Sequence, residues 1–277
     1  RYFQRQEEII AELNNAAAFG FGSAVLQAGE IESERNTAFF ESVLNAVDGM
    51  KLGITLSLGE QNEETLRRWK AAGARRYLLR IETSDPKLYS QLHPVGHSWE
   101  RRAECLKTLR KLNYQTGTGV ICGLPGQSLQ SLARDIGFFA EVDADMIGSG
   151  PYIPHPDTPL AEFDSGANSG ERLRLGLNLI SVTRLYLHDV NIASATALQA
   201  LSDDGRELGV AAGANVIMPN LTWREARSNY RLYPVKPQLD VDAATALDVL
   251  HKRMDAIGET LINDDSGDSK HFARRNR

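Results

Sequence analysis

The sequence predicts an α/β protein built as a (βα)8 TIM barrel that is incomplete at its amino terminus. Short apolar runs alternate with amphipathic helical segments at the spacing of βα units. Each run is followed by glycine and polar residues; for example, the apolar residues 24–26 are followed by Gln-Ala-Gly-Glu at residues 27–30. In such barrels the carboxyl ends of the strands form the mouth that holds the chemistry. The strand ends are therefore the candidate site.

Periodicity and end signals place the elements along the chain. The helix expected at residues 62–73 has Glu63 and Glu64 in its first turn, Arg68 and Lys70 near its end and Gly73 after it, an order that suits the helix dipole. Seven strands are expected at residues 23–27, 53–57, 76–80, 116–122, 145–149, 190–194 and 213–218. The other helices are expected around residues 6–17, 39–47, 99–112, 129–139, 173–185, 198–208 and 241–260.

The strand count bears on the domain organisation. A closed barrel needs eight strands, and the helix at residues 6–17 has no strand before it in a chain that begins with Arg1. We therefore expect strand one and the loop after it to be missing from this sequence. Residues 1–240 are predicted to form the barrel and residues 241–262 a helix packed on it. Residues 263–277, rich in Asp, Ser, Lys and Arg, are predicted to be a flexible tail.

Composition narrows the functional classes. The net charge of -5 argues against a nucleic-acid-binding protein. No apolar run reaches the ~18 residues that a membrane-spanning helix needs, and the charged amino terminus lacks a signal-peptide core. Cys105 and Cys122 share no metal-ligand spacing. We expect a cytoplasmic protein with neither a nucleic-acid nor a membrane partner.

Charged residues at three strand ends are the candidate functional residues. Glu30 and Glu60 each follow a glycine, although a surface carboxylate at the start of a helix would look the same. Arg76, Arg80 and Glu82 share one face of a strand, and charges inside a barrel are costly unless paired or bound to a ligand. We favour a ligand over a structural layer of ion pairs. These residues alone indicate a barrel enzyme that binds an anionic or zwitterionic ligand.

Three other features have ordinary structural explanations. Residues 123–127 read as a tight turn, and the prolines around His155 indicate a rigid loop. Cys105 and Cys122 read as small buried residues rather than reactive thiols.

Several of these stretches resemble a known family. The matching residues are 25–30, 55–60, 76–86, 116–127, 147–160, 213–220 and 232–234, and the proline-rich run at 150–160 makes the resemblance specific. The chain resembles the radical S-adenosylmethionine (SAM) maturases of iron-only (FeFe) hydrogenase, of the HydE type, within the biotin synthase and methylornithine synthase group. The resemblance implies a TIM barrel of the radical SAM type.

The resemblance also implies two sets of site residues. Arg102 matches an arginine that pairs with the SAM carboxylate, and Gly29 and Glu30 lie nearest to the SAM amino group. The implied SAM-binding residues are Gln27, Gly29, Glu30, Ser57, Glu82 and Arg102. The implied substrate-binding residues are Thr55, Arg76, Arg80, Thr196, Met218 and Tyr233.

Two departures from the family pattern stand out. The family binds a 4Fe-4S cluster through a Cys-x-x-x-Cys-x-x-Cys loop after strand one, and this sequence has no such motif. The resemblance implies SAM and a 4Fe-4S cluster as cofactors. Because the motif is missing here, we expect the cluster cysteines to lie before Arg1. A threonine pair of the family is replaced by Ala195 and Thr196, which removes one hydroxyl from the implied substrate site.

The implied function is the cleavage of SAM to a 5′-deoxyadenosyl radical during assembly of the hydrogenase active site (the H-cluster). The implied partners are a small-molecule or small iron-complex substrate, an electron donor such as ferredoxin or flavodoxin, and other hydrogenase maturases. Alternatives are an enzyme similar to methylornithine synthase or biotin synthase, and a cluster-free barrel that binds SAM or another small molecule. An aldolase-like barrel is disfavoured because no lysine occupies a suitable strand position.

Overall fold

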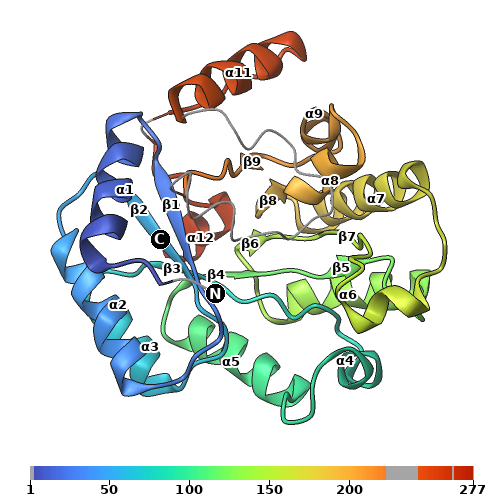
Figure 1. Cartoon of the computed structure of the whole chain (residues 1–277), viewed down its shortest axis with the longest axis horizontal. Coiled ribbons are helices and arrows are strands. Elements are labelled where there is room, and N and C mark those ends of the chain that lie inside the picture. The colour runs from blue at the N-terminus through green and yellow to red at the C-terminus, as the bar shows by residue number, and fades with distance from the viewer. Residues whose placement is uncertain (1–2, 223–242, 264, 277) are drawn as a thin grey trace.

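One curled parallel sheet organises the molecule (Figure 1). The computed structural model describes residues 3–222, 243–263 and 265–276. The sheet has seven strands in the order β1-β2-β3-β4-β6-β8-β9. They are β1 (Ser23–Gln27), β2 (Gly53–Ser57), β3 (Arg76–Leu78), β4 (Gln115–Thr118), β6 (Met146–Ile147), β8 (Asn191–Ser194) and β9 (Val216–Ile217). This is the arrangement of a partial (βα)8 barrel, and it confirms the predicted fold class.

The predicted strands are all present, but one is interrupted. The segment expected at 116–122 divides into β4 and β5 (Ile121–Cys122), and β5 pairs with β7 (Gly150–Pro151) in a second parallel sheet. Between them the backbones at Gly119 and Gly148 approach closely, so that a Cβ at Gly119 would lie 2.2 Å from the Gly148 carbonyl oxygen. This approach bends the chain out of the main sheet before the strand ends.

Helices connect successive strands, and their ends follow the expected signals. In α3 the Asn62 side chain accepts a hydrogen bond of 2.9 Å from the Thr65 amide, with Glu63 and Glu64 in the first turn. The predicted helices are α1 (Gln6–Ala18), α2 (Glu34–Ala46), α3 (Glu63–Ala71), α5 (Trp99–Lys111), α6 (Leu129–Glu141), α7 (Ser169–Leu187) and α11 (Ala243–Ala256). The single helical segment expected at residues 198–208 is instead two helices, α8 (Thr196–Leu201) and α9 (Gly205–Ala211). Sequence reasoning missed α4 (Pro86–Leu92), the 3-10 helix Pro159–Phe163 and α12 (Lys270–Arg275).

The core between the sheet and its outer helices contains a continuous aromatic chain. Phe40 packs edge-on against Trp69, which stacks on Tyr77, and Tyr77 meets Tyr114 edge-on. Trp69, Tyr77 and Tyr114 are fully buried. Their contacts tie α2, α3 and β3 into one body behind the strand ends.

The prediction of a flexible carboxyl-terminal tail was wrong. Residues 265–276 pack against the amino ends of the strands and include α12 (Figure 1). Ser269 is fully buried and its amide donates to Gln115 at 2.6 Å, while Asp268 accepts from Arg76 at 2.6 Å. The polar composition that indicated mobility instead supplies partners for buried polar groups on the sheet.

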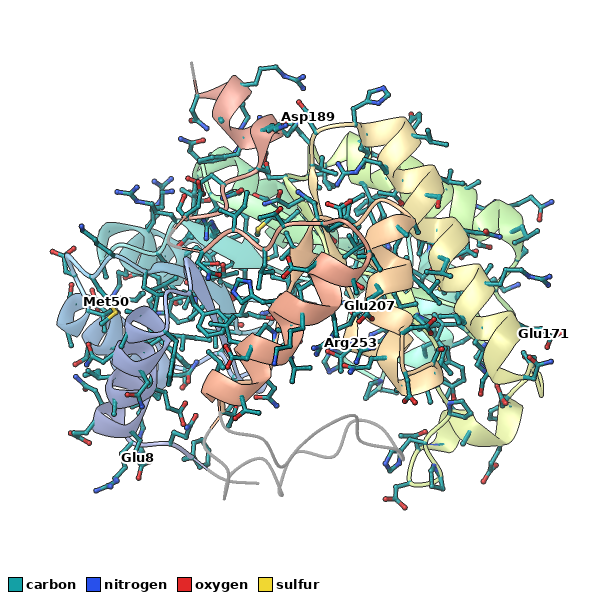
Figure 2. All side chains as sticks on the ribbon, turned by 90° about the horizontal axis from the view of Figure 1, so that it is seen from above. Glu8, Met50, Glu171, Asp189, Glu207 and Arg253 are labelled. Carbon is teal, nitrogen blue, oxygen red and sulfur yellow. The ribbon has the colours of Figure 1, made fainter. Side chains whose placement is uncertain are left out.

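Arg253 of α11 binds Glu207 of α9 (Figure 2) and the carbonyl oxygen of Asp203. None of the helices in the described ranges is long and apolar enough to cross a membrane.

Candidate functional site

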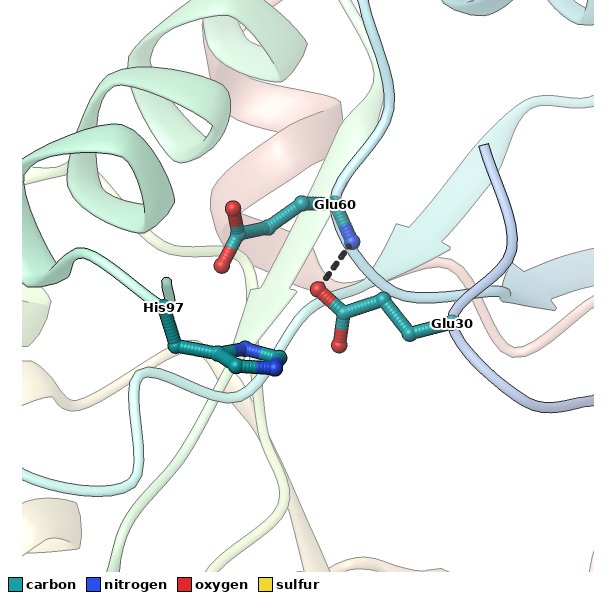
Figure 3. Close-up of side chains that lie close together, drawn as sticks. All are labelled: Glu30, Glu60 and His97. Carbon is teal, nitrogen blue, oxygen red and sulfur yellow. Dashed lines mark hydrogen bonds between the residues drawn. The ribbon is translucent and has the colours of Figure 1, made fainter. Parts of the chain in front are cut away.

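Two neighbouring strand ends bring Glu30 and Glu60 together. Strands β1 and β2 are paired in parallel, with Gln27 opposite Ser57, so the loops that follow them leave the sheet side by side. The Glu60 amide donates to Glu30 Oε1 at 3.0 Å (Figure 3). Gly59 has a φ of 75°, and a Cβ there would lie 2.2 Å from Glu30 Cγ. The glycine is therefore required both for its conformation and for its lack of a side chain.

Arg102 of α5 joins both glutamates. Its Nη1 lies 3.1 and 3.2 Å from the two Glu30 carboxylate oxygens and 2.8 Å from Glu60 Oε1. Its Nε donates to the carbonyl oxygen of Arg80 at 2.6 Å. Burial disfavours the charge on Arg102, but Glu30 and Glu60 outweigh it and raise the pKa of the guanidinium. Arg102 is thus a permanent cation at the mouth.

Arg101, the preceding residue, supplies a second cation. Its Nε lies 3.3 Å from Glu60 Oε2, and its guanidinium also binds Glu32. These residues form one charged cluster at the mouth: the carboxylates of Glu30, Glu32 and Glu60 and the guanidiniums of Arg101 and Arg102. The cluster carries one more negative charge than positive charges. SAM carries a carboxylate, an ammonium and a sulfonium, so its net charge is complementary to this cluster.

Arg80 and Glu82 lie just beyond β3. Arg80 Nη2 donates to the Val120 carbonyl oxygen at 2.9 Å and forms an ion pair with Glu82 at 3.3 Å. Glu82 has a φ of 66°, a strained conformation for a residue other than glycine that is held here by a bridge to Val120. Arg80 Nε and Glu82 Oε2 are buried without hydrogen bonds. Such strain and unmet bonding are typical of ligand sites.

Unpartnered buried polar atoms gather at this mouth. Among the described residues they include Gln61 Oε1, Arg80 Nε, Ser84 Oγ and Tyr89 Oη. Gly29 adds open space, since a Cβ there would meet no atom within 4 Å. Together with the charges, these features fit a zwitterionic ligand such as SAM.

A metal ion fits the same residues less well. Glu30, Glu60 and His97 each present a ligand atom, all within 4.8 Å of one another (Figure 3). The carboxylates are already bound by Arg102, whose charge repels a cation at that point. The cluster is therefore better suited to an organic zwitterion than to a metal.

The remaining sequence-predicted residues lie at different depths of the sheet. Gln27 and Ser57 end β1 and β2, and Thr55 is buried within β2. Arg76 is at the amino end of β3, bound to Asp268 of the tail, and so lies at the opposite end of the strand from Arg80.

The substrate residues predicted on later strands are more exposed. Thr196 begins α8, with Ala195 at the N-cap position and no side-chain cap, and Met218 follows β9 with 39% of its surface exposed. Tyr233 lies outside the described residues.

The two cysteines do not fit a 4Fe-4S cluster that needs three thiolates. Cys105 is on α5, where its thiol donates to the Gln61 carbonyl oxygen at 3.6 Å, and Cys122 is in β5. Burial raises the pKa of Cys105 to about 11 and that of Cys122 to about 12. Both are protonated thiols at neutral pH. No chemical step through a cluster can be derived from these residues.

Four residues near the contact between Glu30 and Arg102 were not among the predicted site residues: Glu60, Tyr89, His97 and Arg101. Glu60 was a candidate because it follows a glycine, but Arg101, Tyr89 and His97 carry no such signal. Tyr89 and His97 come from the connection between β3 and α5, whose helix α4 was not expected. Only the folding of that connection over the strand ends brings them to the mouth.

Comparisons with known proteins agree with the geometry. The family described as the Radical SAM superfamily matches residues 1–139. The [FeFe] hydrogenase maturase subunit HydE of Thermotoga maritima is 39% identical over 98% of this chain and 76% of its own length. The 3-methylornithine synthase of Methanosarcina acetivorans is 28% identical over 83% of this chain and 65% of its own length.

Solved structures show the same fold. The crystal structure of a methylornithine synthase superposes with a TM-score of 0.75 at 24% identity, covering 95% of this chain and 75% of the other. That of HydG, a maturase of the [FeFe] hydrogenase, superposes with a TM-score of 0.66 at 16% identity, covering 78% of this chain and 50% of the other.

Proposed function

Because this chain belongs to the radical SAM superfamily and, within it, to the HydE-type family of [FeFe] hydrogenase maturases, we propose that it forms the barrel that binds and cleaves SAM during H-cluster maturation. The family implies two cofactors, SAM and a 4Fe-4S cluster. The observation that carries the SAM-binding part is the contact of Arg102 on α5 with Glu30 and Glu60, which belong to two neighbouring strand-end loops. The maturase part rests on the 39% identity to HydE.

The proposed division of labour follows from charge. Glu30, whose side chain is 31% exposed, is proposed to hold the methionyl ammonium of SAM in addition to its contact with Arg102. Arg102 holds the carboxylate through the nitrogen that the glutamates do not occupy, because a guanidinium binds a carboxylate in a fixed planar geometry. Gly29 leaves room for the ligand beside the backbone. Gln27, Ser57 and Glu82 complete the proposed SAM site.

When bound, SAM would supply the 5′-deoxyadenosyl radical after receiving one electron from the reduced cluster, with methionine as the other product. The residues of this chain orient SAM and the substrate and keep water away from the radical. Arg80 is proposed to bind an anionic part of a small-molecule or small iron-complex substrate, since its Nε lacks a partner. Thr55, Thr196 and Met218 are further proposed lining residues. Arg76 is the proposed substrate-binding residue that lies farthest from the mouth, at the amino end of β3. Its charge is already neutralised by Asp268, so we propose no direct contact with an anionic substrate group.

The proposed partners are an electron donor such as ferredoxin or flavodoxin and other hydrogenase maturases. Support for the maturases comes from the HydE relative, and the HydG structure shows only that the fold is shared.

A chimera tests the function. The amino-terminal segment of the Thermotoga HydE that precedes the matched region is fused before Arg1, to supply a cluster. We expect the reconstituted chimera to form 5′-deoxyadenosine from SAM and to restore [FeFe] hydrogenase activity in a host that lacks its own HydE.

The outcomes separate the candidates. SAM cleavage without hydrogenase activity would contradict the maturase assignment and favour an enzyme similar to methylornithine synthase or biotin synthase. A chimera that holds its cluster and binds SAM but does not cleave it would contradict the radical chemistry. That result would favour the cluster-free SAM-binding barrel, for which the two buried cysteines are the supporting observation.

A further inference from the structure

A buried tyrosine outside the predicted SAM site lies beside Arg102. Tyr89 is on α4, in the connection between β3 and α5, and is 1% exposed. Its hydroxyl has no hydrogen-bond partner among the described residues. A buried hydroxyl donor without an acceptor is unfavourable, so a ligand that supplies the acceptor would be bound more tightly.

The surroundings of Tyr89 hold its ring in place. The ring stacks on His93 with centroids 3.7 Å apart and an angle of 12° between the planes. The connection is fixed at one end by the Ser84 amide, which donates to Asp135 at 2.6 Å. At its other end, Trp99 donates to the Thr83 carbonyl oxygen at 3.1 Å. The hydroxyl is therefore held in position before any ligand arrives.

The charges around Tyr89 indicate what the ligand presents. Burial raises its pKa and Glu60 and Glu30 add to the rise, whereas the neighbouring Arg102 guanidinium lowers the pKa through its charge and a side-chain contact with the hydroxyl. The neutral hydroxyl can therefore donate at physiological pH. The glutamate oxygens nearby already accept from Arg102, Arg101 and the Glu60 amide. The unmet acceptor is thus an anionic oxygen that comes with the ligand.

We propose that Tyr89 is a further ligand-binding residue whose hydroxyl donates to the carboxylate held by Arg102. This inference rests on the proposed function, because it takes that carboxylate to be the methionyl carboxylate of SAM. Arg102 Nη1 and Nε contact Glu30, Glu60 and the Arg80 backbone, and the guanidinium also lies beside the Tyr89 hydroxyl, so Nη2 and that hydroxyl are placed to meet the same ligand group. Tyr89 and Arg102 then bind one carboxylate from two directions.

The test compares Tyr89→Phe with its parent by calorimetry, both in the chimera that carries the cluster-binding segment before Arg1. The probes are SAM and decarboxylated SAM, which keeps the adenosine, sulfonium and amine but lacks the carboxylate. Tyr89→Phe is expected to weaken SAM binding by about tenfold or more, because a hydrogen bond to a charged group is lost. Binding of decarboxylated SAM is expected to stay unchanged.

Tyr152→Phe is the matched control. Tyr152 is also buried with an unpartnered hydroxyl, but the charges that act on it come from Asp164 and Arg172. This variant is expected to bind both probes like the parent. The melting temperature without ligand adds a second measurement, and Tyr89→Phe is expected to keep or raise it because no hydrogen bond is lost.

Each result decides the matter. Unchanged SAM affinity in Tyr89→Phe, or an equal loss for both probes, would overturn the inference and leave the proposed function intact. A lowered melting temperature with unchanged affinity would assign Tyr89 a purely structural role. Failure of the cluster-bearing parent chimera to bind SAM would overturn the proposed function, and the inference with it.

Discussion

One nitrogen of Arg102, Nη1, lies 3.1 and 3.2 Å from the two carboxylate oxygens of Glu30. Glu30 comes from the loop after β1 and Arg102 from the second turn of α5. Residues 72 positions apart in the sequence thus form the charged centre of the mouth.

Glu60→Gln should destabilise the protein. Glu60 and Arg102 are 6% and 8% exposed, and their ion pair of 2.8 Å leaves part of the Arg102 charge uncompensated when broken. The expected loss in the free energy of unfolding is about 1–3 kcal/mol, measured by denaturant titration. Glu63→Gln, which removes a solvent-exposed ion pair with Arg67, serves as the control and should change little. Equal effects of the two variants would contradict the buried-pair interpretation.

Gly59→Ala should disturb Glu30, whereas Gly49→Ala should not. Both glycines have positive φ values, 75° and 79°, so both variants carry a similar backbone strain of about 1 kcal/mol. Only at Gly59 would the new Cβ meet Glu30, since at Gly49 no atom lies within 4 Å. SAM affinity measured by calorimetry should therefore fall in Gly59→Ala alone. A matching loss in Gly49→Ala would show that strain, not Glu30, is responsible.

The sequence predicted the barrel and the strand ends well because both depend on local patterns. Periodicity located each strand, and a glycine before Glu30 and Glu60 marked the loops that turn toward the mouth. The pairing of these glutamates with Arg102 could not be predicted from the residues alone, because it depends on how α5 packs beside β1 and β2. Tyr89 was missed for the same reason, since α4 is a short helix without clear periodicity.

The prediction for the carboxyl-terminal tail was wrong because it relied on composition. Its charged residues predicted mobility, yet Asp268 and Arg275 bind Arg76 and Asp145 at the amino ends of the strands. Composition shows that a segment is polar, but it does not show whether buried polar groups elsewhere in the fold will bind that segment.

Asp268→Asn should therefore destabilise the protein. Arg76, whose side chain is 5% exposed, would lose the carboxylate that lies 2.6 Å away. We expect the free energy of unfolding to fall by about 1–2 kcal/mol, less than for a fully buried pair because Asp268 is half-exposed. Asp255→Asn on the exposed face of α11 is the control. No difference between the two variants would mean that the tail contributes nothing to stability.

Asp145 should make stability depend on pH. Burial raises its pKa to about 6, above the value of 3.8 expected when the chain is unfolded. The folded state therefore binds the proton more tightly, and this stabilisation is complete below pH 3.8 and is lost as the pH rises through 6. Relative to Asp145→Asn, the parent should lose up to about 3 kcal/mol over this range. Unfolding titrations that run parallel with pH for the two proteins would contradict the shift.

The most direct test of the central claim is a crystal structure of this chain with SAM. The account predicts that the methionyl carboxylate lies against Arg102 and the ammonium against Glu30, at the carboxyl ends of β1 to β3. SAM bound at another place on the sheet, or bound here with its carboxylate turned away from Arg102, would contradict it.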